Sequence, residues 1–268
     1  MQTRSASVGQ IFKWTNLYTH ILEDTKNNAG VKRNFDMAVF EASRFDDLVE
    51  DYYDGYRWVY YDTLSYQSGT SRGKGVEIDL KIASIQFTGG SGYDTILSSI
   101  SQLIGSPYSD RLSGSNLNDT IMGGRGNDYI NGGDGTDVLY GNSGNDTLTG
   151  GYGSDLLRGG PGNDVFKYNS PLDSTWVAWV PGDTITDFSS LDKIDLSAVD
   201  ASSRVSGNQA FTWVGSLSTP RVGIGKLGAH YSQNERCLWL IGNCFDDHRG
   251  FRIRLENVTS INPSNITF

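Results

Sequence analysis

The segment from Gly105 to Lys167 consists of seven contiguous nine-residue blocks, and this repeat constrains the fold more than any other feature. Each block has glycine first, aspartate sixth and an apolar residue eighth. A block of this length makes half a turn of a flattened solenoid, with a glycine-rich bend followed by a short strand. The pattern predicts parallel sheets that enclose a thin core of eighth-position side chains. These side chains are Leu112, Ile121, Ile130, Leu139, Leu148, Leu157 and Phe166.

The sixth-position aspartates are expected to form two columns, because two half-turns return the chain to the same side. The columns are Asp110, Asp128, Asp146 and Asp164 on one side, and Asp119, Asp137 and Asp155 on the other. Neighbours in a column would lie about 4.8 Å apart and repel by a few kcal/mol at an effective dielectric of about 20. Carboxylate and carbonyl oxygens without Cys or His favour calcium over zinc, copper or magnesium. The chain is therefore predicted to bind several calcium ions.

The blocks resemble the Gly-Gly-x-Gly-x-Asp-x-apolar-x repeat of the RTX family, and the best copies begin at Gly123 and Gly132. The resemblance implies a calcium-loaded parallel β-roll. In that family, the loop carbonyls and the aspartate of one half-turn share an ion with the loop two half-turns on. The first two blocks depart from the pattern, since Tyr108 and Leu117 stand where glycine is expected. The metal-binding residues that the resemblance implies are Asp110, Asp119, Gly124, Gly126, Asn127, Asp128, Gly133, Gly135, Thr136, Asp137, Asn142, Gly144, Asn145, Asp146, Gly151, Gly153, Asp155, Gly160, Gly162, Asn163 and Asp164.

Other interpretations of the glycine- and aspartate-rich segment fit less well. A flexible linker has this composition, but it does not keep an apolar residue in phase seven times. Collagen requires glycine at every third position. An EF-hand requires the D-x-[DN]-x-[DN]-G spacing with a closing Glu, which the chain lacks.

The whole chain is predicted to be all-β, with four regions. Residues 1–54 form a partly helical segment, because apolar residues recur at helical spacing from Ile11 to Leu22 and from Asp36 to Val49. Residues 55–104 are predicted to be degenerate roll turns with an insertion. Within them, Gly89 to Ile96 is one more copy of the repeat, out of phase. Residues 105–167 are the repeats, and residues 168–268 form a β-rich C-terminal capping and secretion domain.

The C-terminal region has a second resemblance. Segments such as Asp183–Phe188, Asp192–Ser197 and Phe251–Leu255 resemble the C-terminal domain of serralysin-type metalloproteases. Proteins of this kind are substrates of bacterial type I export, which reads an uncleaved C-terminal signal. The tail Asn265–Phe268 resembles that family's ending. The resemblance thus implies the type I secretion machinery as a partner and an extracellular location.

Charge and hydropathy limit the partners. The formal net charge is −9 and the pI is about 4.8, which disfavours nucleic acid, and also acidic polysaccharide in the absence of metal. No apolar run approaches the ~18 residues of a transmembrane segment. Residues Met1–Gln10 lack the pattern of an N-terminal signal peptide.

The two cysteines, Cys237 and Cys244, leave two alternatives open. The residues between them could form a strand and a tight turn that brings the thiols together, which would allow a disulfide in an oxidising compartment. They could equally be two free buried thiols. Zinc binding is disfavoured, because no other Cys or suitable His lies nearby.

The known catalytic motifs of RTX enzymes are missing. A serralysin requires H-E-x-x-H with a third His, but His20, His230 and His248 are the only histidines and none is paired at that spacing. An RTX lipase requires G-x-S-x-G, and the nearest segment, Gly89–Tyr93, lacks the last glycine. Protease and lipase activity are therefore not expected.

Two classes of function remain. The first is a secreted, non-catalytic calcium-binding protein that folds outside the cell, with attachment to a surface or to an extracellular polysaccharide as an extension. The second is the calcium-binding module of a secreted enzyme, such as a metalloprotease, a lipase or a polysaccharide-modifying enzyme. Trp176, Trp179 and Trp213 could stack on sugar rings or pack in a core.

Overall fold

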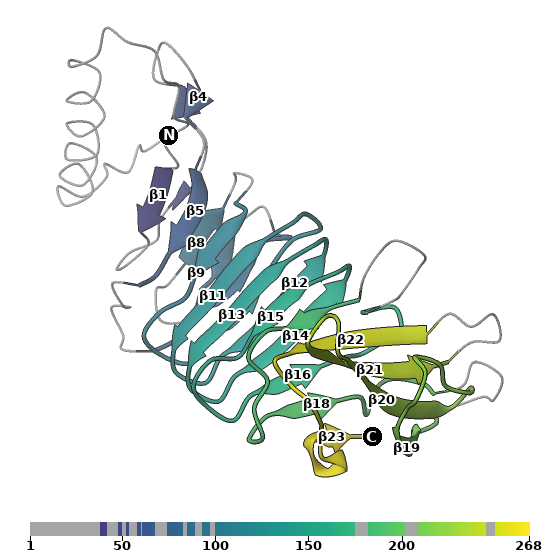
Figure 1. Cartoon of the computed structure of the whole chain (residues 1–268). Coiled ribbons are helices and arrows are strands. Elements are labelled where there is room, and N and C mark those ends of the chain that lie inside the picture. The colour runs from purple at the N-terminus through teal and green to yellow at the C-terminus, as the bar shows by residue number, and fades with distance from the viewer. Residues whose placement is uncertain are drawn as a thin grey trace, which may run out of the picture. The chain divides into compact units, whose positions relative to one another are not determined.

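The computed structural model describes a β-protein whose main part is a parallel β-roll (Figure 1). The described strands belong to the compact unit Met37–Phe268. The described residues are 38–41, 48–49, 52–53, 58–59, 61–67, 74–82, 85–88, 93–96, 100–174, 182–201, 208–244 and 250–268. The predicted helix from Ile11 to Leu22 lies outside them.

The larger sheet of the roll, sheet I, has eleven strands in the order β1-β5-β9-β11-β13-β15-β17-β22-β21-β20-β19. Its strands are parallel from β1 to β22, antiparallel from β22 to β20, and parallel again between β20 and β19. The bounds are β1 Ala38–Glu41, β5 Tyr61–Ser65, β9 Gln102–Ile104, β11 Thr120–Arg125, β13 Val138–Ser143, β15 Leu156–Arg158, β17 Thr184–Ile185, β22 Gly250–Glu256, β21 Cys237–Asn243, β20 Lys226–Ser232 and β19 Thr212–Ser216.

The opposite sheet, sheet II, has seven parallel strands in the order β23-β18-β16-β14-β12-β10-β6. Its bounds are β23 Ile266–Thr267, β18 Lys193–Asp195, β16 Val165–Lys167, β14 Thr147–Tyr152, β12 Tyr129–Asp134, β10 Arg111–Ser113 and β6 Glu77–Asp79. A short 3₁₀-helix, Pro263–Asn265, precedes β23.

The core lies between the two sheets and follows the predicted register. Leu112, Ile130 and Leu148 are paired neighbours in sheet II, and Ile121 and Leu139 are paired neighbours in sheet I. All seven eighth-position side chains are at most 1% exposed. Consecutive blocks therefore alternate between the sheets, and the predicted parallel β-roll with a thin apolar core is confirmed.

The roll extends beyond the repeats on the N-terminal side. Strands β5, β6 and β9 contribute Leu64, Ile78 and Leu103 to the same core. The prediction that Gly89 to Ile96 is another repeat is wrong for its described part. Strand β8 (Tyr93–Ile96) instead joins a three-stranded sheet with β2 (Leu48–Val49) and β7 (Ile85–Phe87), outside the roll. The sequence shows the same break in phase, because Asp94 precedes Asp110 by 16 residues instead of 18.

The helix predicted from Asp36 to Val49 is also wrong where the structure describes it. Ala38–Glu41 and Leu48–Val49 are strands, and β1 pairs in parallel with β5. Val39 and Phe40 favour a strand as readily as a helix, so the pairing with a neighbouring strand decides. Strands β3 (Tyr52–Tyr53) and β4 (Trp58–Val59) form a separate antiparallel pair.

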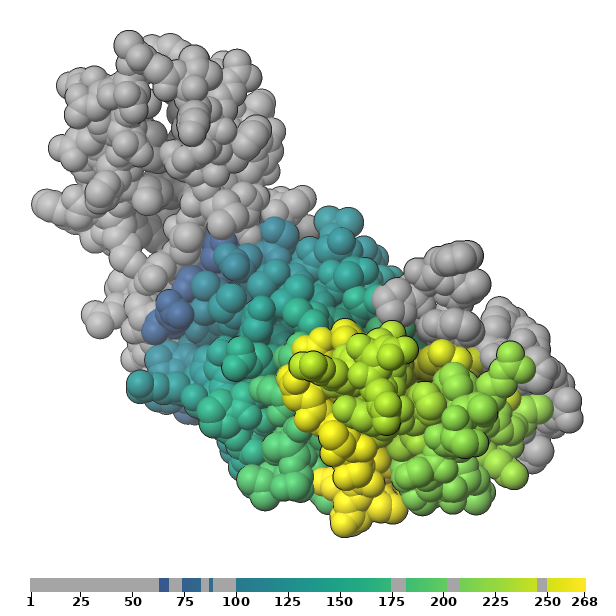
Figure 2. Space-filling view, in the orientation of Figure 1, coloured from purple at the N-terminus to yellow at the C-terminus, as the bar shows by residue number. Residues whose placement is uncertain are grey.

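On the C-terminal side, the chain first continues the roll and then leaves it. Strand β17 pairs with β15, β18 pairs with β16, and β22 and β23 extend the two sheets. The last residues, yellow in Figure 2, accordingly lie against the green turns that follow the repeats. Strands β20 to β22 then form an antiparallel extension of sheet I.

The two cysteines are free in this extension. Both are buried, but Cys237 begins β21 and Cys244 follows its end, so one continuous strand separates them. Of the two alternatives, the tight turn with a disulfide is therefore wrong, and the two free buried thiols are confirmed.

Candidate metal site

The bends of the later repeats are shaped by residues in the left-handed region. The second and fourth positions of these loops include Gly124 (φ 111°), Gly135 (φ 134°) and Gly151 (φ 104°). Asn142 takes the second position of its loop with φ 70°, which Asn tolerates better than most residues. Glycine at these positions lets the bend close without strain, and each bend then leads directly to the sixth-position aspartate.

The aspartates form the two predicted columns, held by a repeated backbone hydrogen bond. The amide of each aspartate donates to Oδ1 of the aspartate two blocks on. In the first column these N···O distances are 2.8 Å for Asp110 to Asp128, 2.8 Å for Asp128 to Asp146 and 2.9 Å for Asp146 to Asp164. In the second they are 2.8 Å for Asp119 to Asp137 and 2.9 Å for Asp137 to Asp155.

Both columns continue past the repeats, which the sequence analysis did not foresee. Asp155 donates to Asp183 Oδ1 and Asp164 donates to Asp192 Oδ1, each at 3.0 Å. The partners are 28 residues apart instead of 18, because the chain inserts ten residues after the last block. The signal that could have revealed them is the Asp-x-apolar pattern at Asp183 and Asp192, which survives without the glycines.

The second carboxylate oxygen separates two kinds of loop. The last five repeats have glycine at the fourth position, and we call their bends glycine-type loops. In these five loops and at Asp183, Oδ2 is buried and has no hydrogen-bond partner. A buried acceptor without a partner is destabilising. Because such an oxygen recurs at the same place in successive turns, it indicates a binding site for a ligand. The aspartates concerned are Asp128, Asp137, Asp146, Asp155, Asp164 and Asp183.

The first two repeats have serine at the second position, and we call their bends serine-type loops. In these loops the aspartate Oδ2 accepts a hydrogen bond from within the loop. Ser106 and Ser115 each donate their amide to Oδ2 of the following aspartate, at 2.6 Å. Asp110 also accepts the Ser106 hydroxyl and the Val76 amide at Oδ1, both at 2.7 Å. These are the first two blocks, which also depart from the repeat consensus.

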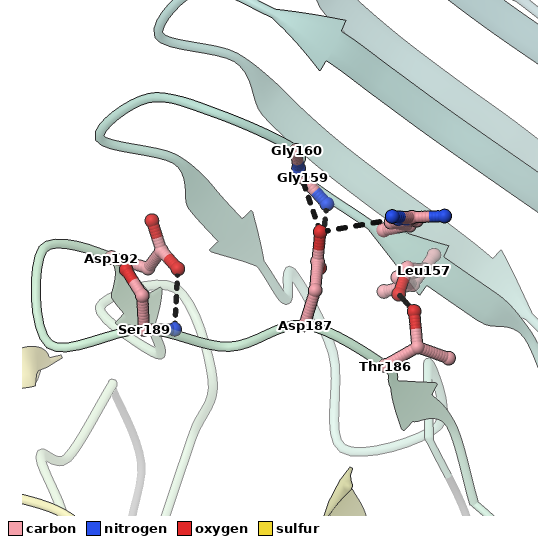
Figure 3. Close-up of polar contacts among 8 residues, drawn as sticks. Leu157, Gly159, Gly160, Thr186, Asp187, Ser189 and Asp192 are labelled. Carbon is pink, nitrogen blue, oxygen red and sulfur yellow. Dashed lines mark hydrogen bonds and ion pairs between the residues drawn. The ribbon is translucent and has the colours of Figure 1, made fainter. Parts of the chain in front are cut away.

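Two loops after the repeats are closed in the same way. Asp173 accepts the Asn169 amide at 2.7 Å, and Asp192 accepts the Ser189 amide at 2.7 Å (Figure 3). Beside Asp192, the Asp187 carboxylate accepts the amides of Gly159 and Gly160 and pairs with the Arg158 guanidinium at 3.4 Å. Asp173 and Asp192 thus each accept an amide of their own loop, as Asp110 and Asp119 do.

The electrostatics of the columns follow from this geometry. Burial is the main cause that raises the pKa of Asp128 from 3.8 to about 8, and the neighbouring Asp110 and Asp146 add to it. For the same reasons the pKa of Asp137 rises to about 6, that of Asp155 to about 7 and that of Asp164 to about 6. A buried column of like charges is unfavourable without a cation, so a bound cation would stabilise the ionised carboxylates.

Backbone carbonyl oxygens of the next loop in the column lie near the unpartnered oxygens of Asp128, Asp137 and Asp146. A β-carbon added to Gly132 would meet both Asp137 Oδ2 and the carbonyl oxygen of Gly150 in the next loop of the same column. One added to Gly144 would collide with the carbonyl oxygen of Gly126. No group of three or more Asp, Glu, His or Cys side chains converges on one point among the described residues. The oxygens present therefore combine carboxylates with carbonyls, a hard donor set that fits calcium.

The fifth-position residues, which are among the predicted metal-binding residues, also link successive bends through their side chains. Their side chains lie exposed at the loop surface, where they form a ladder of hydrogen bonds along the roll. Asn127 Oδ1 accepts the Asn145 amide and Asn145 Oδ1 accepts the Asn163 amide, both at 2.8 Å. Thr136 donates its amide to Asn118 Oδ1 at 2.8 Å. Since the Asn127 and Asn145 side-chain oxygens already accept these amides, we expect these residues to offer a metal their backbone carbonyls.

Among the histidines, only His230 falls in the described part of the chain. Its Nδ1 lies 3.0 Å from the carbonyl oxygen of Leu217. His20, His248, Trp176, Trp179 and Gly89–Gly92 lie outside the described residues. Where the structure describes the chain, no helix has the length and apolar character needed to span a membrane.

The chain is similar to known proteins that carry a nonapeptide repeat. The family model of the RTX calcium-binding nonapeptide repeat matches residues 104–139, 113–148 and 131–166. Among solved structures, the AlgE6R2 subunit of the Azotobacter vinelandii mannuronan C5-epimerase is 32% identical, with a TM-score of 0.45, and the match covers 59% of this chain and 92% of that one. The AlgE6R3 subunit of the same enzyme is 29% identical, with a TM-score of 0.33 and coverages of 60% and 78%. No curated protein matches the chain.

Proposed function

Because the chain belongs to the family of proteins that carry RTX calcium-binding nonapeptide repeats, we propose that it is a secreted protein whose roll folds when it meets calcium outside the cell. The observation that carries this proposal is the row of buried Oδ2 atoms without partners in the glycine-type loops. When bound, calcium supplies positive charge and oxygen coordination there. The chain supplies aspartate oxygens and loop carbonyls. The stacked apolar side chains of the eighth positions hold successive loops in register.

The energetic argument concerns the thin core. Each repeat buries one large apolar side chain, while ordering its backbone costs about 1–2 kcal/mol per residue. Calcium at tenfold excess over its Kd contributes about 1.4 kcal/mol per site, so five sites contribute roughly 7 kcal/mol. That is comparable to the stability of a typical domain. We therefore expect the roll to be unfolded where free calcium is submicromolar and folded where it is millimolar.

This dependence fits an exported protein. A chain that stays unfolded in a calcium-poor cytosol can be threaded through a narrow exporter and then fold outside. In the folded chain β23 is part of sheet II, and the Lys193 ammonium donates to the Ser264 carbonyl. An exporter that reads this tail would have to do so before the roll folds. We propose the type I machinery for this step.

The test is a calcium titration of the full chain, followed by far-UV circular dichroism and calorimetry. We expect β-structure to form with uptake of several calcium ions and an affinity of roughly 10⁻⁴ to 10⁻³ M, as in extracellular modules. Magnesium at the same concentration is the control and should induce little structure. A β spectrum in EDTA that calcium leaves unchanged would refute the proposal.

A second proposal, attachment to an acidic extracellular polysaccharide, has one supporting observation. A hollow of about 740 Å³ on the C-terminal extension is lined by residues that include Arg221, Asn243 and Arg252. Two arginines thus line this hollow on a protein whose formal net charge is −9. Binding of calcium-loaded protein to a polyuronate but not to a neutral glucan, with loss of binding in Arg221→Ala, would support it. Equal binding of both polymers would count against it.

A further inference from the structure

We infer that the Lys81 ammonium is a built-in cation for Asp119 and Asp137, the first pair of the second aspartate column, and that it competes with calcium for this pair. The inference rests on the proposed calcium function of the roll. It adds a residue outside the repeats that sets the calcium affinity of one site. Calcium at this pair has to displace the lysine, so the site is harder to fill than it would be without Lys81.

Lys81 occupies the second position of a roll turn that precedes the repeats. Strand β6 pairs with β10 in sheet II, with Asp79 opposite Ser113. Leu80 continues this register, because its amide donates to the Ser113 carbonyl at 3.0 Å. The Lys81 amide donates to Asp79 Oδ1 at 2.9 Å, which fixes the backbone of the turn. Lys81 therefore stands one turn before Ser115, at the loop position that glycine or Asn takes in the later repeats.

The Lys81 side chain extends along the column onto the bend of Asp137. A β-carbon added to Gly133, the second residue of that bend, would lie 3.3 Å from Lys81 Nζ and 3.4 Å from its Cε. The same β-carbon would collide with the carbonyl oxygen of Ser115. The ammonium and this carbonyl oxygen therefore approach Gly133 from the same side, in the space that the missing side chain leaves open.

The two carboxylates of this pair each keep one open oxygen. Asp119 is 2% exposed and its Oδ1 has no hydrogen-bond partner, while Asp137 is 0% exposed and its Oδ2 has none. The Asp119 amide donates to Asp137 Oδ1 at 2.8 Å and holds the two residues side by side. Two adjacent buried carboxylates are costly to ionise unless a positive charge lies nearby.

The charge of Lys81 acts on both carboxylates. Burial raises the pKa of Asp119, and the hydrogen bonds from Ser115 together with the Lys81 charge oppose the rise. Burial likewise raises the pKa of Asp137 to about 6, and Lys81 again opposes the rise. Among the described column aspartates with a raised pKa, these two alone have a basic side chain that lowers it. The lysine thus singles out one pair of the column.

The ammonium compensates the pair without a tight contact. The ion pairs among the described residues do not include Lys81, and its side chain is exposed. A compact charge on a flexible stem can turn into solvent when a divalent ion takes the oxygens of both loops. We expect the lysine to weaken calcium binding at this pair roughly tenfold, which is the size of the Coulomb interaction between one and two charges about 6 Å apart in water.

The experiment is denaturant unfolding of the full chain at a series of calcium concentrations, from the lowest that keeps the wild type folded up to saturation. At the lowest concentration Lys81→Met should reduce the folding equilibrium constant by up to about tenfold, because the pair loses its built-in cation. At saturation the loss should vanish, because calcium replaces the lysine. Lys81→Arg keeps the charge and should follow the wild type.

The matched control is Lys167→Met, on the outer face of β16. It removes a lysine away from the second column, so any change in its stability should be the same at every calcium concentration. A loss of stability confined to low calcium in Lys81→Met is therefore specific to the aspartate pair and does not follow from the lower net positive charge.

A second measurement follows the lysine directly. Isotope-labelled methyl groups added to the lysine side chains give each one an NMR signal, and the signal missing from Lys81→Arg belongs to Lys81. Between the lowest calcium concentration that keeps the chain folded and saturation, this signal should move as the ammonium leaves the pair. The Lys167 signal should stay in place.

The outcomes separate this inference from the proposed function. A loss in Lys81→Met that fades as calcium rises, with a calcium-dependent Lys81 signal, supports the inference. A loss of the same size at all calcium concentrations, no loss at all, or a Lys81 signal that calcium leaves unchanged overturns the inference, and the calcium function stands. If the wild type takes up no calcium, both fall.

Discussion

The loops in the middle of the roll and those at its ends contain the same aspartate in different surroundings. In the middle, Oδ2 of residues such as Asp137 is buried without a partner, whereas at the N-terminal end Asp110 has both oxygens satisfied by Ser106 and Val76. The loop around Asp119 is intermediate. Its Oδ2 accepts Ser115, but its Oδ1 has no partner.

The second residue of the loop accounts for the difference. Glycine or Asn with positive φ at this position, as at Gly133 and Asn142, leaves the carboxylate open to a ligand. Serine at this position closes the loop onto the carboxylate, as Ser115 does. The aspartate alone therefore does not define a metal site, and the loop of Asp110, with both carboxylate oxygens satisfied, acts as a cap that needs no ion.

The largest expected effect comes from comparing Asp137→Asn with Asp110→Asn. Asp137 has a neighbour on each side of its column, Asp119 and Asp155, and would share an ion with each. Its substitution in calcium should therefore cost about 3 kcal/mol of unfolding free energy. Without calcium the same change should not destabilise, because it removes a buried charge. Asp110→Asn should cost about 1–3 kcal/mol with or without calcium, since it weakens protein hydrogen bonds. Denaturant unfolding in calcium and in EDTA measures both. If the stability of the two variants depended equally on calcium, the two kinds of loop would not differ in metal binding.

A second, intermediate effect concerns the pH dependence of the calcium-free chain. The pKa of Asp128 is raised from 3.8 to about 8 and that of Asp155 to about 7. Between the unfolded and folded values the folded roll binds more protons than the unfolded chain, so its stability falls as pH rises. In calcium-free buffer the chain should therefore show more β-structure near pH 5 than near pH 8. Circular dichroism at both pH values tests this. Saturating calcium should remove the trend, because the metal holds the carboxylates ionised.

The smallest effect is the conversion of an end loop into a middle loop. Ser115→Gly combined with Leu117→Gly removes the Ser115 hydroxyl that donates to Asp119 Oδ2 at 2.9 Å and supplies the two glycines of the consensus. The variant should gain calcium binding worth up to about 1.4 kcal/mol, and lose about 1 kcal/mol without calcium because glycine is more flexible. Asn116→Gly, in the same loop, controls for added flexibility. Calorimetry that finds no gain in calcium uptake would show that the second and fourth positions do not decide metal binding.

Much of the site could be predicted from the sequence because its period is strict. A nine-residue repeat fixes which side chains face inward and which aspartates stack, so the core and the seven column members follow from spacing alone. Asp183 and Asp192 were missed because a ten-residue insertion breaks the phase while the backbone still returns to register. The strand at Ala38–Glu41 was missed because local apolar spacing does not reveal a distant pairing partner.

Periodicity and the chemistry of the repeated side chains were enough to predict the β-roll, its two aspartate columns and a hard oxygen-binding metal. The tertiary structure decided which carboxylate oxygens stay open. That depends on whether the amide of a residue such as Ser115 or Ser189 reaches the carboxylate, which is a matter of backbone direction. It also decided where the columns end, because Asp183 meets Asp155 only after the chain has folded back across the insertion.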